Sequence, residues 1–158
     1  MSKLLKFVSV VIIVMGILMV CGGAWGAVYI SQHVVQEKIT TPEDASIPNV
    51  LVKGPLTLKA QADIIRHHTL TMTGEKTFAE MPRQIPKVDA NGSAVLGEDG
   101  KPVMVANTAR DIWITATTLI TALNLGLLSY AFSGLAVVLG IVFILIGLTF
   151  YAMSKRQI

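Results

Sequence analysis

The 158-residue sequence has little charge, few aromatic residues and one cysteine. Charged residues make up 15% of the chain, well below the roughly 25% that is usual in soluble domains. With Cys21 alone, no disulfide can form within the chain. The sequence also has no HExxH zinc motif, no GxSxG nucleophile motif and no glycine-rich phosphate loop. It therefore carries no established catalytic signature.

Charge is missing altogether from two long apolar runs. Residues 7–30 form an uncharged run of 24 residues and residues 112–153 a run of 42. A helix needs about 20 mainly apolar residues to cross a membrane, so both runs qualify. The sequence predicts a mainly α-helical membrane protein with two transmembrane helices and a small extracytoplasmic segment of helix and loop.

The first run has an alternative interpretation as a cleavable signal peptide. Lys3 and Lys6 give it a basic start, and Ala24-Trp25-Gly26 has the small-x-small pattern of a cleavage site. Because the chain retains the run from Met1 onward, we interpret residues 1–31 as an uncleaved N-terminal transmembrane anchor.

Acidic residues are absent from both ends of the chain. All ten lie between Glu37 and Asp111, together with nine basic residues, whereas the charged residues of the ends are Lys3, Lys6, Lys155 and Arg156. Lysine and arginine next to membrane segments favour the cytoplasmic side. We expect a plasma-membrane protein with both termini in the cytoplasm and residues 32–106 outside. The net charge of +3 reflects this topology and gives no reason to expect nucleic acid as a partner.

The second run is too long for one membrane crossing. Its 42 residues would extend about 63 Å as a helix, against about 30 Å of hydrocarbon. Either two spans meet in a turn near residues 129–133, or one helix crosses with its second half and stands outside with its first. No proline or charge interrupts the run. We expect one long helix over residues 107–154, with about 133–153 in the membrane.

Small residues form a stripe in each run. In the first run Ser9, Gly16 and Gly23 repeat every seven residues, and Gly22 and Gly26 make a GxxxG motif. In the long run the small residues follow one another three or four apart, and the last comes seven later: Ala122, Gly126, Ser129, Ser133, Ala136, Gly140 and Gly147. Such stripes let helix backbones approach closely in membranes, whether the neighbour is the other apolar run or another copy of the chain. We expect the helix-packing residues to be these seven together with Gly16, Gly22, Gly23 and Gly26.

The segment between the runs contains all six prolines. The stretch Thr41-Pro42-Glu43-Asp44 predicts the start of a short helix, and Gly54-Pro55 predicts a second helix over about residues 56–72 that Gly74 ends. Turn signals at Asn91-Gly92 and Asp99-Gly100 predict a small hairpin or loop over residues 87–105. A segment of this size is marginally stable alone, so we expect it to lean on the long helix, on other copies or on a partner.

Two of the three histidines, His67 and His68, are adjacent and follow Asp63 closely. On a helix Asp63 and His67 share a face, whereas His68 points about 100° away, so the two rings cannot both reach one metal. An iron site of two histidines and one carboxylate would also need His33. We expect Asp63 to orient His67 and His68 to face solvent or a neighbour, and we expect no catalytic residue, metal or cofactor.

Three stretches resemble a family of small actinobacterial membrane proteins of unknown function. They are ITTPEDASIPNV (39–50), VKGPLTLKAQADIIRHHTLTMTGEKTFAEM (52–81) and ARDIW (109–113). The resemblance implies an uncharacterised cell-envelope protein with two apolar segments around an outside segment. Many members carry the automatic label aromatic ring-opening dioxygenase, a chemistry that needs a converging iron triad.

These features predict a non-enzymatic integral membrane protein with a structural or scaffolding role in the cell envelope. We expect copies to self-associate through the small-residue stripes, with the lipid bilayer as surroundings. One alternative is an accessory subunit that packs on a larger membrane complex. The other is a metal-dependent enzyme, as the family label implies.

Overall fold

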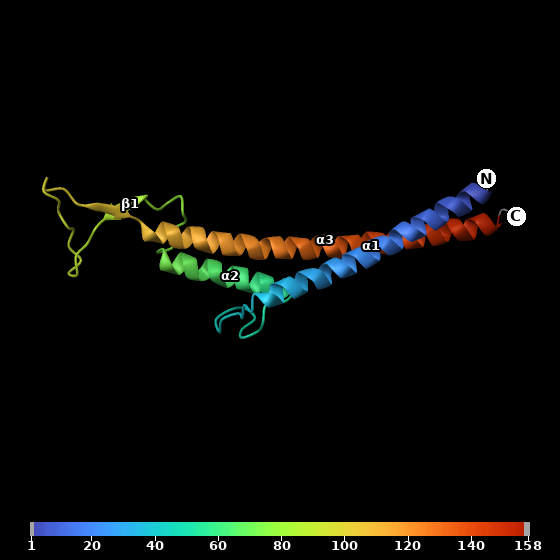
Figure 1. The fold of residues 1–158 in the computed structure, drawn as a ribbon, viewed down its shortest axis with the longest axis horizontal. Coiled ribbons are helices and arrows are strands. Elements are labelled where there is room, and N and C mark those ends of the chain that lie inside the picture. Colours follow the sequence, from blue (N-terminus) through green and yellow to red (C-terminus); the bar gives the residue numbers. More distant parts are fainter. Residues whose placement is uncertain (1, 157–158) are drawn as a thin grey trace.

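A computed structural model describes residues 2–156. The described residues form three helices, α1 (Ser2–Gln36), α2 (Pro55–Met72) and α3 (Thr108–Arg156), and two short strands, β1 (Gln84–Pro86) and β2 (Met104–Ala106) (Figure 1). Both α1 and α3 are long and apolar enough to cross a membrane. The predicted fold class is confirmed, because the chain is mainly helical with two long apolar helices and a shorter helix between them.

The second apolar run lies in one uninterrupted helix, as the sequence predicted. α3 contains 49 residues, which is about 74 Å of helix and more than twice the roughly 30 Å of membrane hydrocarbon. Several of its hydroxyl side chains donate to the carbonyl oxygen four residues earlier. Thr118 Oγ1 donates to Ile114 O at 2.9 Å, and Ser129 Oγ donates to Leu125 O at 2.8 Å.

α3 is the element on which both other helices pack. In Figure 1, α1 runs antiparallel along the C-terminal half of α3, and α2 lies along its N-terminal half. The molecule is therefore elongated, with both chain ends at one extremity and the β1–β2 segment at the other.

A small hydrophobic core fills the junction where α1 ends and α2 begins. Its buried members are Val52, Leu58, Ala62 and Leu123, surrounded by partly buried side chains of all three helices and of the loop after α1. The Tyr130 hydroxyl donates to the Lys53 carbonyl at 2.8 Å and ties that loop to α3. The middle segment thus leans on the long helix, as the sequence analysis expected.

The loop between α1 and α2 differs from the prediction. The expected short helix at Thr41 is wrong, because residues 43–49 form turns and bends. The side chain of Thr41 caps no helix and instead exchanges two hydrogen bonds with Val50, donating to its carbonyl at 3.2 Å and accepting from its N–H at 3.1 Å. A backbone bridge between Thr40 and Leu51 closes the same loop.

α2 begins and ends where the sequence predicted. Pro55 is its first residue, a position where the missing N–H costs no hydrogen bond. The Thr57 hydroxyl accepts from the N–H groups of Lys53 and Gly54, at 3.0 and 3.1 Å. These two backbone N–H groups, which lie just before the helix, thereby gain a hydrogen-bond partner. Gly74 follows the last turn with φ +62°, a conformation that glycine adopts without steric cost.

The segment before α3 forms a narrow projection. β1 and β2 pair antiparallel, with Ile85 opposite Val105. Two further bridges join Val88 to Ala94 and Leu96 to Pro102. The predicted turns at Gly92 and Gly100 are present, with φ values of +78° and +73°. The hairpin prediction for residues 87–105 is therefore confirmed as two small turns extending from a two-stranded base.

Candidate helix-packing site

α1 and α3 meet along a seam of small residues from both stripes. A Cβ atom built on Gly16 would lie 2.6 Å from the Gly140 carbonyl oxygen, and one built on Gly140 would lie 2.6 Å from the Gly16 carbonyl oxygen. A Cβ on Gly23 would lie 2.5 Å from the Ser133 carbonyl oxygen. Real Cβ atoms essentially never come closer than 3.0 Å to such atoms, so the two backbones touch without room for a side chain.

The seam repeats every seven residues on both helices. Ser9 lies next to Gly147, since a Cβ on Gly147 would be 2.9 Å from the Ser9 carbonyl oxygen. The next contacts are those of Gly16 with Gly140 and of Gly23 with Ser133. Each contact lies seven residues later in α1 and seven residues earlier in α3 than the contact before it. Two antiparallel helices that keep a seven-residue period wind gently around each other. The close approach extends over several turns.

Two buried serines extend the seam toward the chain ends. Ser9 and Ser154 are both 0% exposed. Each satisfies its hydroxyl within its own helix, Ser9 on the Lys6 carbonyl and Ser154 on the Tyr151 carbonyl, both at 2.7 Å. Ser154 was not among the predicted packing residues, although it continues the seven-residue spacing of Gly140 and Gly147 by one step.

The stripe of α3 changes partner toward its N-terminal half. A Cβ on Gly126 would lie 3.4 Å from Cδ1 of Leu58, a residue of α2. This is ordinary van der Waals contact with a side chain, in contrast to the backbone contact at Gly140. Gly126 therefore belongs to the packing of α2 on α3.

The remaining predicted packing residues do not share one surface. Gly26 faces Ser133, with 3.0 Å from an added Cβ to the Ser133 Oγ, whereas Gly22 has no atom within 4 Å of such a Cβ. The GxxxG motif of α1 therefore does not form a single contact face. On α3, Ala122 and Ser129 are exposed, and Ala136 is partly exposed.

The closest contacts of the two stripes lie inside one chain. From the sequence, either the other apolar run or another copy could be the neighbour of each stripe. In the structure α3 lies against Gly16 and Gly23, and α1 lies against Gly140 and Gly147. A periodic stripe identifies the face of a helix that allows close approach, and it does not identify the helix that will approach. The seam faces of α1 and α3 are therefore already occupied within one chain.

A partly enclosed cavity lies beside the junction of the three helices. Its volume is about 480 Å³, and its lining is mostly apolar, with Val34, Leu119 and Ala122 among the lining residues. Gln61 also lines it, and the Gln61 Oε1 atom is buried without a hydrogen-bond partner among the residues that the structure describes. The cavity marks the point where α2 and α1 do not fully cover α3.

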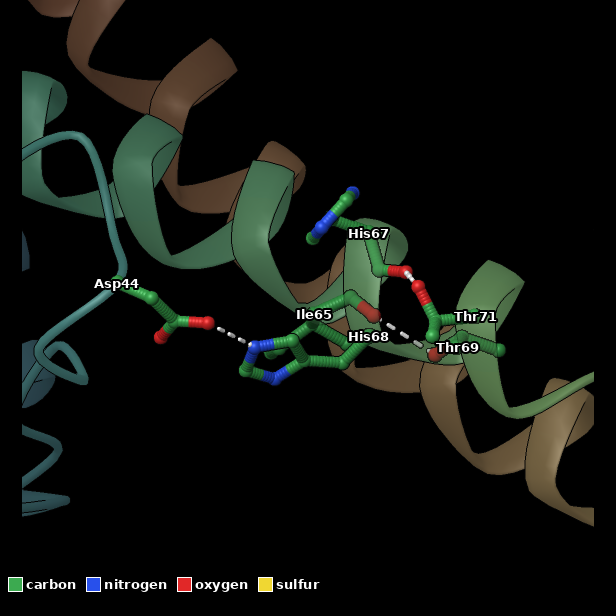
Figure 2. Close-up of polar contacts among 6 residues, drawn as sticks. All are labelled: Asp44, Ile65, His67, His68, Thr69 and Thr71. Carbon is green, nitrogen blue, oxygen red and sulfur yellow. Dashed lines mark hydrogen bonds and ion pairs between the residues drawn. The ribbon is translucent and has the colours of Figure 1, made fainter.

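The adjacent histidines point in different directions (Figure 2). His68 Nε2 lies 2.5 Å from Asp44 Oδ2 and tethers α2 to the loop after α1. This hydrogen bond lowers the pKa of the Asp44 carboxyl below its usual value. The expectation that Asp63 orients His67 is wrong, because Asp63 pairs with Lys59 at 2.7 Å, one turn earlier on the same face. The side chain of His67 is exposed.

The third histidine is held separately on α1. His33 Nδ1 lies 2.9 Å from the Tyr29 carbonyl oxygen, and the two rings are 4.1 Å apart. Within residues 2–156, no group of three or more His, Cys, Asp or Glu side chains is placed to hold a metal ion. The structure does not bring His33, Asp63 and His67 together as a ligand set.

Arg110 is a tertiary tether that the sequence analysis did not single out. Its guanidinium lies 3.7 Å from the Phe78 ring centroid and donates to the carbonyls of Phe78 and Met81, at 2.9 and 2.5 Å. These contacts join the start of α3 to the turn after α2. Sequence spacing gave no signal for them, because the partners lie about thirty residues away.

The described chain thus builds one long helix seam, one small junction core and a few polar tethers between elements. Comparison with known proteins supplies no family for this arrangement: no protein-family model, no curated protein and no solved structure matches the chain.

Proposed function

We propose that the chain is a non-enzymatic integral membrane protein with a structural, scaffolding role in the cell envelope. The α1–α3 hairpin is the membrane anchor. α2 and the N-terminal half of α3 form a stalk that holds the β1–β2 projection away from the lipid. The observation that carries this proposal is the length of α3, whose 49 residues are more than twice the about 20 that one crossing requires.

Aromatic side chains support the position of the membrane along α3. Tyr130 and Tyr151 lie about 32 Å apart along the helix at 1.5 Å per residue, close to the thickness of the hydrocarbon, about 30 Å. Lys155 Nζ lies 4.9 Å from the Tyr151 ring centroid. On α1, Trp25 and Tyr29 pack together with ring centroids 5.4 Å apart. Aromatic belts and terminal lysines are typical of membrane surfaces.

The proposed orientation places both termini in the cytoplasm and residues 32–106 outside. It rests on the ten acidic residues between Glu37 and Asp111 and on the purely basic ends. In a Cys21→Ser background, Ser93→Cys should react with a membrane-impermeant thiol reagent on intact cells. Gln157→Cys should react only after the cells are opened. The reverse labelling pattern would invert the topology.

An accessory-subunit role is the second candidate, and one observation favours it. Outside the proposed membrane region, α3 still exposes large apolar side chains, including Ile114, Leu125 and Leu128, at 51 to 59%. A solvated stalk with such a face needs a cover, which another protein would provide as well as a second copy. The resemblance to small envelope proteins agrees with both roles.

A further inference from the structure

The partly enclosed cavity beside the junction of the three helices has the size of a small-molecule site. We call it the junction cavity. Its volume is about 480 Å³, within the range of about 300–1,000 Å³ that ligand pockets span. All three helices and the loop after α1 contribute to its wall, so the site exists only where α1 ends and α2 begins on α3.

The wall of the junction cavity is mainly aliphatic. Six of its ten lining residues have large aliphatic side chains: Val34, Ile39, Leu58, Ile65, Leu119 and Leu123. Two more, Ala122 and Gly126, are small and leave the space open. Transfer of apolar surface from water to such a wall is favourable. A ligand that fits this cavity therefore needs an apolar body.

The other two lining residues, Glu37 and Gln61, both offer oxygen acceptors. Gln61 Oε1 is buried without a hydrogen-bond partner among the described residues, and an unpaired buried acceptor is costly. The terminal torsion of a glutamine side chain is soft, so a rotation lets this oxygen meet a donor in the cavity. Both polar groups therefore favour a ligand that donates hydrogen bonds.

The Glu37 side of the junction cavity is electronegative. Glu37 directly follows the last residue of α1, and its N–H still donates to the Val34 carbonyl at 3.2 Å. A helix C-terminus carries a partial negative charge, which adds to that of the carboxylate. Within residues 2–156 the ion pairs are Lys59–Asp63 and His68–Asp44, and neither includes Glu37. This side of the cavity therefore favours a cation.

We propose that the junction cavity binds a small molecule with an apolar body and one ammonium group. The body lies against the aliphatic wall, and the ammonium has three N–H donors, enough for the Glu37 carboxylate and Gln61 Oε1. Hydrogen bonds between charged groups are about twice as strong as neutral ones, so an amine is preferred over an alcohol of the same shape. This binding goes beyond the proposed scaffolding role.

The position of the cavity favours a free amine as the ligand. Its lining residues on α3 run from Leu119 to Gly126 and precede Ser133, where the proposed membrane segment begins. In the proposed topology the cavity therefore faces the water outside the lipid. An ammonium-bearing lipid headgroup has the same donor chemistry and is the other source that the experiment has to distinguish.

Methyl NMR of the full-length protein in mild detergent tests the proposal. The probes are phenylpropylamine, phenylpropanol and phenylpropanoate, which share one apolar body and differ in charge. We expect the amine to shift the methyl signals of Val34, Ile65 and Leu119, and to bind at least tenfold more tightly than the alcohol. Phenylpropanoate should not bind. Equal affinities of amine and alcohol, or a preference for the carboxylate, would overturn the proposal.

Two variants locate the binding. Glu37→Gln, at an exposed position, should lower the affinity for the amine at least fivefold and leave that for the alcohol unchanged. Glu98→Gln changes an exposed carboxylate of the β1–β2 projection and should alter neither. Ala122→Leu fills the cavity and should weaken amine and alcohol alike. If the amine binds Glu37→Gln or Ala122→Leu as tightly as the parent, the probe lies elsewhere and the site is refuted.

Lipid discs identify the source of the ligand. The affinity for phenylpropylamine should be equal in discs of phosphatidylcholine and in discs that also contain phosphatidylethanolamine. A lower affinity in the second kind of disc would show competition by the lipid headgroup and overturn the assignment to a free amine. Failure of every probe to bind would refute the site and leave the scaffolding role intact, because that role is tested by thiol labelling of Ser93→Cys and Gln157→Cys.

Discussion

The two halves of α3 are packed by different means. In the C-terminal half, Gly140 brings its backbone against that of Gly16, 2.6 Å from an added Cβ to a carbonyl oxygen. In the N-terminal half, the contact with α2 is made by side chains, with Leu58 and Leu123 buried and Gly126 merely touching Leu58. α3 therefore packs through its backbone in its C-terminal half and through side chains in its N-terminal half.

The difference follows from the two surroundings that we propose for these halves. In water, burial of large apolar side chains drives α2 onto α3. In lipid, the hydrophobic effect gives helices little reason to associate, and close packing of small residues has to supply the attraction. Along α3, the main packing residues change from glycine in the C-terminal half to leucine in the N-terminal half. We propose that this change lies at the membrane surface.

The largest expected effect comes from filling the backbone seam. Gly140→Leu places a side chain where even a Cβ would lie 2.6 Å from the Gly16 carbonyl oxygen. Overpacking costs about 1–3 kcal/mol and occasionally more, and we expect the upper end because backbone atoms cannot move aside easily. Thermal unfolding in mild detergent should shift down clearly. Val138→Leu, at a 57% exposed position, is the control and should melt like the parent.

Truncation of the side-chain contact should have the next largest effect. Leu58→Ala removes a side chain that is 2% exposed, and such changes cost about 2–5 kcal/mol in large cores. We expect about 2 kcal/mol here, because the junction core is small. Hydrogen exchange should accelerate in α2 and leave the α1–α3 seam unchanged. Leu56→Ala, at a 75% exposed position, should leave exchange in both regions as it was.

The same substitution made in both halves sharpens the comparison. Replacing glycine by alanine inside a helix gains up to about 1 kcal/mol from propensity. Gly126→Ala should realise part of this gain, because its Cβ would meet only the Leu58 side chain at 3.4 Å. Gly140→Ala should lower stability, because its Cβ would meet backbone. Equal melting shifts for the two variants would contradict the distinction between backbone and side-chain packing.

The smallest expected effect concerns the tether between His68 and Asp44. The hydrogen bond from His68 lowers the pKa of Asp44, so the folded chain binds fewer protons than the unfolded chain near the usual aspartate pKa. The stabilisation is therefore present above the usual pKa, about 3.9, and is lost as pH falls through the lowered folded-state value. Carbon NMR of Asp44 should show a low titration midpoint that His68→Ala raises. His67→Ala should raise the midpoint less than His68→Ala, because the His67 charge is the smallest of the causes that lower the Asp44 pKa.

Much of the architecture was predictable from the sequence, because helix formation depends on near neighbours. The missing charge in residues 7–30 and 112–153 predicted two long apolar helices, and the absence of proline predicted that α3 continues without a break. Gly54-Pro55 and Gly74 marked the ends of α2 correctly, since capping and turn conformations are local properties. The turns at Gly92 and Gly100 followed from the same kind of signal.

The tertiary structure decided which surfaces meet. The spacing of Gly16, Gly23 and Gly140 identified faces that permit close approach, but only the antiparallel path of the chain paired α1 with α3 inside one molecule. The same path of the chain brings His68 into contact with Asp44, whereas Asp63 pairs with Lys59 on its own helix. Such partners lie far apart in the sequence or compete with nearer ones. Periodicity fixes the direction in which a side chain leaves its helix, whereas the packing of the whole chain determines what it contacts.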